Sequence, residues 1–173
     1  MALSLYDVSV GSYLQMLGAT SGYLEKGAGH CAENGIDLDE VVETRLWPDM
    51  LPFRFQVISV VHHSLGAIKG IKAGLFTPPD GYGEPDYDGL QKLVADARAE
   101  LEGLDRGEID ALVGKDMAFG LGERKLPFVA EDFVLSFSLP NLYFHATTAY
   151  DILRNKGVPL GKRDFMGALR IKR

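Results

Sequence analysis

Apolar residues recur with the period of an α-helix through most of this 173-residue chain, and this repeat constrains the fold more than any other feature. Asp37 and Glu40 have the capping-box spacing, which predicts a further short helix over 38–43. The spacing predicts four long helices, over 5–32, 51–75, about 88–104 and about 131–155. Four long helices pack most simply as an all-α, up-and-down four-helix bundle.

Proline and glycine mark the segments that interrupt the helical pattern. Asp49 is a candidate N-cap for the second long helix, and Asp88 for the third. Pro140 predicts a bend in the last long helix, and Gly157 predicts its end. The pattern also predicts a turn at Pro48 and Pro52, a loop over 77–89, a short turn over 107–113, and an irregular excursion or small hairpin over 114–130.

Composition excludes several classes of protein. The length favours a single domain over residues 1–173, and a net charge of −6 argues against a nucleic-acid-binding role. One cysteine, Cys31, allows no internal disulfide framework. The first residues lack a basic leader followed by an apolar run, and no apolar run approaches the roughly 20 residues that span a bilayer. We therefore expect a cytoplasmic protein without a membrane or nucleic-acid partner.

Asn141 and His145 are the strongest candidates for a polar site. They stand four residues apart on a predicted helix, so both side chains lie on one face. Two interpretations stay open. The pair forms a site, or Asn141 repairs the backbone after Pro140 while His145 is a hydrogen-bonded interior histidine.

His62 and His63 lie in the second long helix. Because successive helical residues point about 100° apart, at most one should face an inner site, and the sequence does not choose between them. His30, one of these two and His145 would supply three imidazoles, enough for a transition metal with an open position. For each histidine, a solvated or core-edge role is the plainer interpretation, and no local metal-binding motif is present.

Two further patterns concern packing. Gly66, Gly70 and Gly74 repeat every four residues, which favours close approach of a neighbouring backbone over room for a ligand. From Arg154 onward, seven basic residues face one acid, whereas the region from Asp80 to Asp110 holds ten acids and three bases. Attraction within the fold or across a dimer is the expected reason.

Three stretches resemble a known family, domain of unknown function nineteen ninety-three (DUF1993). They are "LYDVSVGSYLQML", "RLWPDMLPFRFQV" and "SLPNLYFHATTAYDILRNKGVPLGKRDFMG", and the resemblance covers nearly the whole chain. That family resembles a branch of the DinB/YfiT-like proteins. The resemblance implies an up-and-down four-helix bundle and a homodimer.

Metal-binding members of that superfamily use one histidine of the second long helix and an H-x-x-x-H pair on a late helix. The resemblance assigns the first position to His62 or His63 and one of the pair to His145. Asn141 stands at the other, and an amide is a poor ligand for zinc or nickel, so the implied metal site is incomplete. Asp49, near the start of the second long helix, is a candidate for the missing ligand.

The sequence therefore predicts a dimeric small-ligand-binding or accessory protein, with Asn141, Tyr143 and His145 contacting the ligand. The alternative is a transferase or hydrolase that depends on a divalent metal, zinc or nickel. In that alternative, His145 and either His62 or His63 bind the metal, and Asn141 or Tyr143 orients the substrate.

Overall fold

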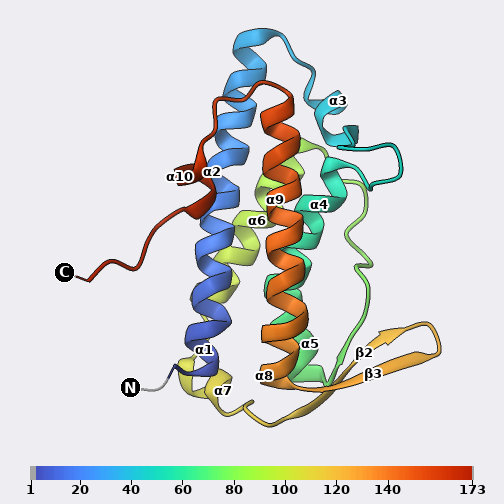
Figure 1. The fold of residues 1–173 in the computed structure, drawn as a ribbon, viewed down its shortest axis with the longest axis vertical. Coiled ribbons are helices and arrows are strands. Elements are labelled where there is room, and N and C mark those ends of the chain that lie inside the picture. The colour runs from blue at the N-terminus through green and yellow to red at the C-terminus, as the bar shows by residue number, and fades with distance from the viewer. Residues whose placement is uncertain (1–2, 173) are drawn as a thin grey trace.

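The computed structural model of the chain describes residues 3–172, and four long helical segments run side by side through this part (Figure 1). A π-helical turn interrupts the second segment, and another interrupts the fourth. The long segments are α2 (Val10–Asn34), α4 (Phe53–Val61) continued by η1 (His62–Gly66) and α5 (Ala67–Ala73), α6 (Tyr87–Glu102), and α8 (Ala130–Phe133) continued by η2 (Val134–Ser138) and α9 (Leu139–Asn155). Short helices are α1 (Leu5–Val8), α3 (Leu38–Glu43), α7 (Arg106–Asp110) and α10 (Lys162–Met166).

The second and third long segments run in the same direction. Phe53 and Tyr87 stack at the first turns of α4 and α6, with ring centroids 5.9 Å apart. Lys69 Nζ and Glu100 Oε1 pair at 2.9 Å near the opposite ends. The expected up-and-down order is therefore wrong at this step. The loop 77–86 is a crossover that carries the chain back along the bundle before α6 begins (Figure 1).

A small sheet lies at the end of the bundle where α5 ends and α8 begins (Figure 1). Within residues 3–172 it has three strands in the order β1 (Leu75–Phe76), β2 (Asp116–Leu121) and β3 (Arg124–Val129). The antiparallel pair β2–β3 confirms the predicted hairpin, but β1 joins it in parallel, so the all-α expectation is wrong. Gly74 ends α5 with φ of 79° and redirects the chain into β1, which is too short to show a strand period.

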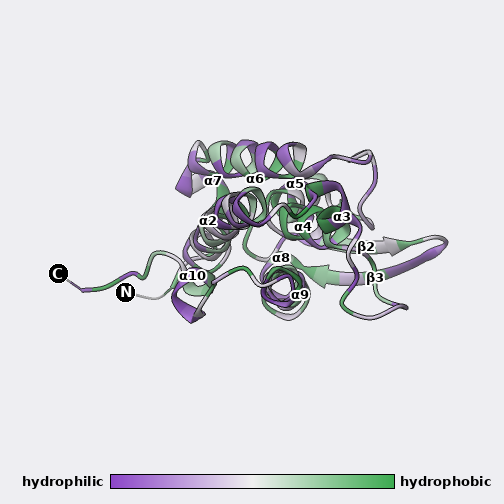
Figure 2. Cartoon of the chain, turned by 90° about the horizontal axis from the view of Figure 1, so that it is seen from above, coloured by the Kyte–Doolittle hydropathy of each residue, from purple (hydrophilic) through white to green (hydrophobic). Residues whose placement is uncertain are grey.

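Seen from above, the helices form three layers, with α2 and α4 between α6 and α9, and the hairpin extends to one side (Figure 2). Tyrosines supply several of the largest buried side chains. Tyr87 donates its hydroxyl to Leu24 O at 2.8 Å, which also ties α6 antiparallel to α2. Burial raises the pKa of this phenol, so it stays protonated.

Several helix boundaries differ from the prediction in physically clear ways. Ser9 separates α1 from α2, whereas one continuous helix was expected. Pro52, not Asp49, occupies the cap of α4, and Asp86, not Asp88, caps α6 by accepting a hydrogen bond from Gly89 N. The predicted helix over 38–43 is confirmed with the same bounds.

Within the last long segment, the irregular turn lies before Pro140 rather than at it. Residues 134–138 form η2, and Pro140 stands in the first turn of α9, where its missing N–H is tolerated. Gly157 follows the end of α9 with φ of 89°, as predicted.

Within the described part of the chain, the acidic region 80–110 and the basic C-terminal region do not form ion pairs with each other. Acids between 80 and 110 pair with the α5 lysines, with bases of α6 and with Arg54, and across residues 3–172 none pairs with the C-terminal bases. Over the same residues, no helix combines the length and apolar character that crossing a membrane requires.

Candidate functional site

The described chain contains two π-helical turns, η1 and η2, which a buried hydrogen bond joins. Ser138 Oγ lies 2.6 Å from His63 O. Since a carbonyl oxygen can only accept, the Ser138 hydroxyl is the donor. Tyr13 OH lies 2.8 Å from Ser138 Oγ and therefore donates to it. These buried bonds tie α2, η2 and η1 together. Single π-helical turns inside α-helices are frequent at functional sites.

Three imidazoles gather where these turns meet. The rings of His62 and His63 have centroids 5.5 Å apart, and those of His63 and His145 are 5.7 Å apart with planes only 14° from parallel. His62 and His63 are 8% and 6% exposed. Both rings are buried, but His63 stacks on His145, whereas His62 points its nitrogens toward the crossover loop. Both belong to η1, whose wider turn reduces the angle between successive side chains.

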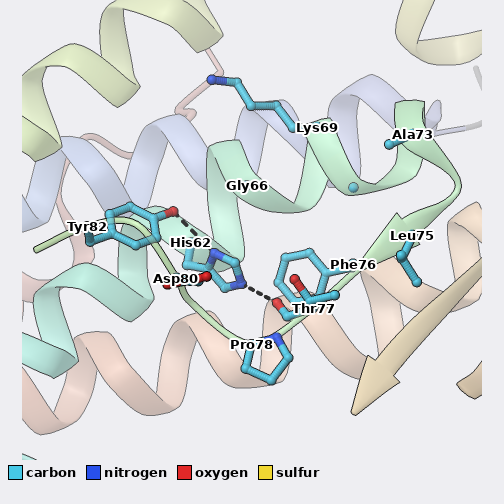
Figure 3. A pocket seen from close by; sticks show the side chains of 11 residues that line it. His62, Gly66, Lys69, Ala73, Leu75, Phe76, Thr77, Pro78, Asp80 and Tyr82 are labelled. Carbon is cyan, nitrogen blue, oxygen red and sulfur yellow. Dashed lines mark hydrogen bonds between the residues drawn. The ribbon is translucent and has the colours of Figure 1, made fainter. Parts of the chain in front are cut away.

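His62 joins the cluster to the crossover loop. Its Nε2 lies 2.7 Å from Thr77 O, and its Nδ1 lies 3.2 Å from the Tyr82 hydroxyl (Figure 3). The Thr77 carbonyl has no hydrogen to give, so Nε2 carries the ring proton. Nδ1 then presents a lone pair, and Tyr82 donates to it.

His145 has the opposite tautomer. Gln56 donates its amide nitrogen to Leu51 O at 2.8 Å, which fixes the amide orientation and points Oε1 toward His145. His145 Nδ1 lies 2.8 Å from that oxygen and donates to it, which leaves Nε2 with the lone pair. His63 differs from both, because its buried Nδ1 has no hydrogen-bond partner among residues 3–172.

All three imidazoles are neutral at pH 7. Burial, helped by His62 and His145, lowers the pKa of His63 from 6.5 to about 3. Burial, with a smaller effect of His62, lowers that of His145 to about 4. Burial also lowers the pKa of His62, against the opposing effect of the Thr77 carbonyl. A charged imidazole would lose its hydration here without gaining a carboxylate partner.

The other sequence-predicted residues do not join this cluster. Asn141 is half-buried and donates its amide to Phe137 O at 2.7 Å, which is the helix-repair role considered above. Tyr143 is 41% exposed and lies two residues from His145, about 200° around the helix. The hypothesis that His30 completes the site is wrong, because His30 pairs with Asn34 near the end of α2 and its Nε2 approaches Gly157.

Two further candidates lie apart from the cluster. Cys31 is buried in the core near the end of α2, where burial raises the pKa of its thiol, so it has the inert character expected of a packing residue. Asp49 is exposed in the turn before α4.

The metal implied by the superfamily resemblance does not fit this arrangement. Across residues 3–172, no three His, Cys, Asp or Glu side chains are grouped so that they could hold an ion. His62 uses both nitrogens within the chain, and Asn141 gives its amide to the helix backbone. The near-parallel rings of His63 and His145 remain, which are two imidazoles rather than three.

A hollow of about 320 Å³ opens beside His62, between α5, β1 and the crossover loop (Figure 3). Gly66 leaves its floor open, because a Cβ there would stand 3.1 Å from His62 Nδ1. Gly70 serves the predicted close packing, since its Cβ would meet Phe76 at 2.9 Å. The polar and charged residues that line the hollow are His62, Lys69, Thr77, Asp80 and Tyr82.

Sequence reasoning missed Tyr82 and Gln56, which determine the tautomers of His62 and His145. Tyr82 stands between Gly81 and Gly83 in a loop, and an aromatic residue between two glycines is a detectable signal. Gln56 carries no such signal, because its role depends on a partner 89 residues away.

Comparison with known proteins agrees with this fold. The crystal structure of a DinB family member protein from Shewanella denitrificans matches with a TM-score of 0.80 and 25% sequence identity. The match covers 98% of this chain and 95% of that one, which confirms the DinB-like resemblance. A search of curated proteins finds no match. Residues 5–166 match the model of DUF1993, described as a domain of unknown function. The chain belongs to the DUF1993 family.

Proposed function

We propose that this protein binds a small molecule in the hollow beside His62, and that it is a binding protein rather than an enzyme. The observation that carries the proposal is that His62, Tyr82 and Asp80 line one open space of about 320 Å³. Pockets of this size with a few convergent polar groups are the usual form of small-ligand sites.

The lining supports a ligand that is partly apolar and partly polar. Apolar side chains from Leu75, Phe76 and Pro78 cover one part of the wall. The Lys69 ammonium on α5 already pairs with Glu100 at 2.9 Å, and Asp80 on the crossover loop lies beside His62 and Tyr82 (Figure 3). A small molecule with an apolar body and a neutral polar group therefore matches the site better than a multiply charged one.

The chemistry of the imidazoles supports binding over catalysis. A general base works best when its pKa lies near the working pH, whereas the pKa values of His63 and His145 are about 3 and about 4. Such weakly basic rings remove protons poorly at pH 7 but accept hydrogen bonds. Cys31, the lone thiol of the chain, is buried in the core away from the hollow.

A fragment screen tests this proposal. Uniformly 15N-labelled protein is titrated with a library of small neutral and polar fragments, and binding is read from amide shifts of residues around the hollow. Ala73→Trp fills the space, because Ala73 lines the hollow at the end of α5. Ala99→Trp is the matched control, an exposed alanine of α6 outside that lining.

Fragments that bind the wild type should fail to bind Ala73→Trp and should bind Ala99→Trp unchanged. Binding that survives in Ala73→Trp, or shifts that cluster elsewhere on the chain, would contradict the proposal.

The metal-dependent alternative and the homodimer remain predictions. Gln56 orients His145 as an outer partner orients a metal-binding histidine, which is the feature that favours the alternative. Metal analysis of protein purified without a histidine tag decides it. Sedimentation velocity across a range of concentrations tests the homodimer.

A further inference from the structure

We propose that Tyr82 is a displaceable internal ligand, and that the molecule which replaces it carries a hydroxylated aromatic ring. This inference rests on the proposed function and names the class of ligand for the same site. Three features of Tyr82 support it: its partner, its packing and the loop that carries it.

The partner of Tyr82 is His62, which already accepts a hydrogen bond from a phenol hydroxyl. The Tyr82 hydroxyl lies 3.2 Å from His62 Nδ1, and the two rings meet edge to face with centroids 5.8 Å apart (Figure 3). The bond from His62 Nε2 to Thr77 O fixes the tautomer, so Nδ1 can only accept. A neutral phenol satisfies this nitrogen, whereas a phenolate or carboxylate has no hydrogen to offer.

The packing of Tyr82 is incomplete on several sides. Its side chain lines three separate hollows, of about 320, 250 and 220 Å³. The first lies toward α5 and β1, the second is lined by Leu65 and Leu93 toward α6, and the third by Phe55 and Ile58 of α4. Tyr82 is only half-buried, and it is the residue that the linings of all three hollows share. Its removal would join them into one site with apolar walls and the His62 acceptor inside.

The crossover loop is lightly attached. Gly81 and Gly83, which flank Tyr82, have φ of 76° and 65°, a left-handed conformation that glycine adopts without strain. Among residues 3–172, His62 makes the hydrogen bonds that tie the middle of this loop to the bundle, and the exposed Glu84 adds a long 3.8 Å pair with Arg54. Displacement of the tyrosine ring would therefore break few interactions.

Phenol and toluene are the probes for this inference, since they differ by one hydroxyl. In Tyr82→Ala, phenol should regain the bond to His62 Nδ1 and bind about five-fold more tightly than toluene, the ratio expected for one net hydrogen bond. The wild type, whose own phenol fills the space, should bind both probes much more weakly. The double variant Tyr82→Ala/His62→Phe should lose the preference for phenol. Calorimetric titration measures all of these affinities.

Equal affinity of Tyr82→Ala for phenol and toluene would overturn the inference, as would no binding of either. Tyr82→Phe keeps the ring and covers the case in which the alanine variant does not fold. Phenol should bind Tyr82→Phe more tightly than the wild type, because it supplies the missing hydroxyl, and equal affinity would again overturn the inference. If phenol fails while the Ala73→Trp experiment succeeds, the proposed function stands and the ligand class is wrong.

Discussion

Replacement of His63 by leucine should remove much of the acid sensitivity of this protein. His63 is buried, neutral and has an unpartnered Nδ1, whereas in the unfolded chain its pKa returns to about 6.5. Below pH 6.5 His63 is protonated in the unfolded state, whereas in the folded state it is protonated only near pH 3. The stability that this histidine contributes is therefore complete above pH 6.5 and is lost as the pH falls toward 3.

The size of this loss of stability follows from how far the pH lies below 6.5, the pKa of the histidine in the unfolded chain. Each pH unit is worth about 1.4 kcal/mol for one group, so the wild type should lose about 2 kcal/mol from His63 between pH 7 and pH 5. His63→Leu should not lose this amount. At pH 7 the variant should already equal or exceed the wild type in stability, because leucine removes a buried nitrogen without a partner.

Urea unfolding followed by far-ultraviolet circular dichroism, at pH 7 and at pH 5, measures the difference. The comparison between variants cancels the carboxylates that titrate in the same range. His30→Leu, a histidine outside the cluster, is the matched control and should lose as much stability as the wild type. If His63→Leu loses as much stability as the wild type between the two pH values, the burial argument for His63 is refuted.

Three further outcomes are expected. Gln56→Leu should lower the free energy of unfolding by about 1–3 kcal/mol, because His145 Nδ1–H loses its acceptor, and urea unfolding measures it. Gly70→Ala should destabilise the fold by about 1–3 kcal/mol because its Cβ would meet Phe76 at 2.9 Å, whereas Gly22→Ala, with open space around it in α2, should raise the melting temperature. Untagged protein should contain far less than one zinc or nickel per chain by mass spectrometry, since the described residues offer no three-ligand group.

Helices were the part of this fold that sequence could predict, because burial of one face imposes a repeat that survives in the amino-acid order. The helix over 38–43 and the hairpin within 114–130 were both recognised on local patterns. The parallel order of α4 and α6 was not, because helix periodicity carries no information on direction. A loop such as 77–86 fits a crossover as well as a turn. The two-residue strand β1 was likewise too short to be recognised.

For the site, sequence identified the histidines but not what they do. His62, His63 and His145 were all candidates, and they do lie together. The burial of both His62 and His63 occurs in a π-helical turn, which no residue pattern had predicted. Asn141 looked like a site residue because residue type and spacing do not reveal which hydrogen bond a side chain makes.

The measurement that tests the account most directly is a long-range 1H–15N spectrum of the histidine side chains at pH 7. The account predicts three neutral imidazoles, with the proton on Nε2 of His62 and on Nδ1 of His145. A charged ring among His62, His63 and His145 at this pH, or the opposite tautomer of either His62 or His145, would contradict it.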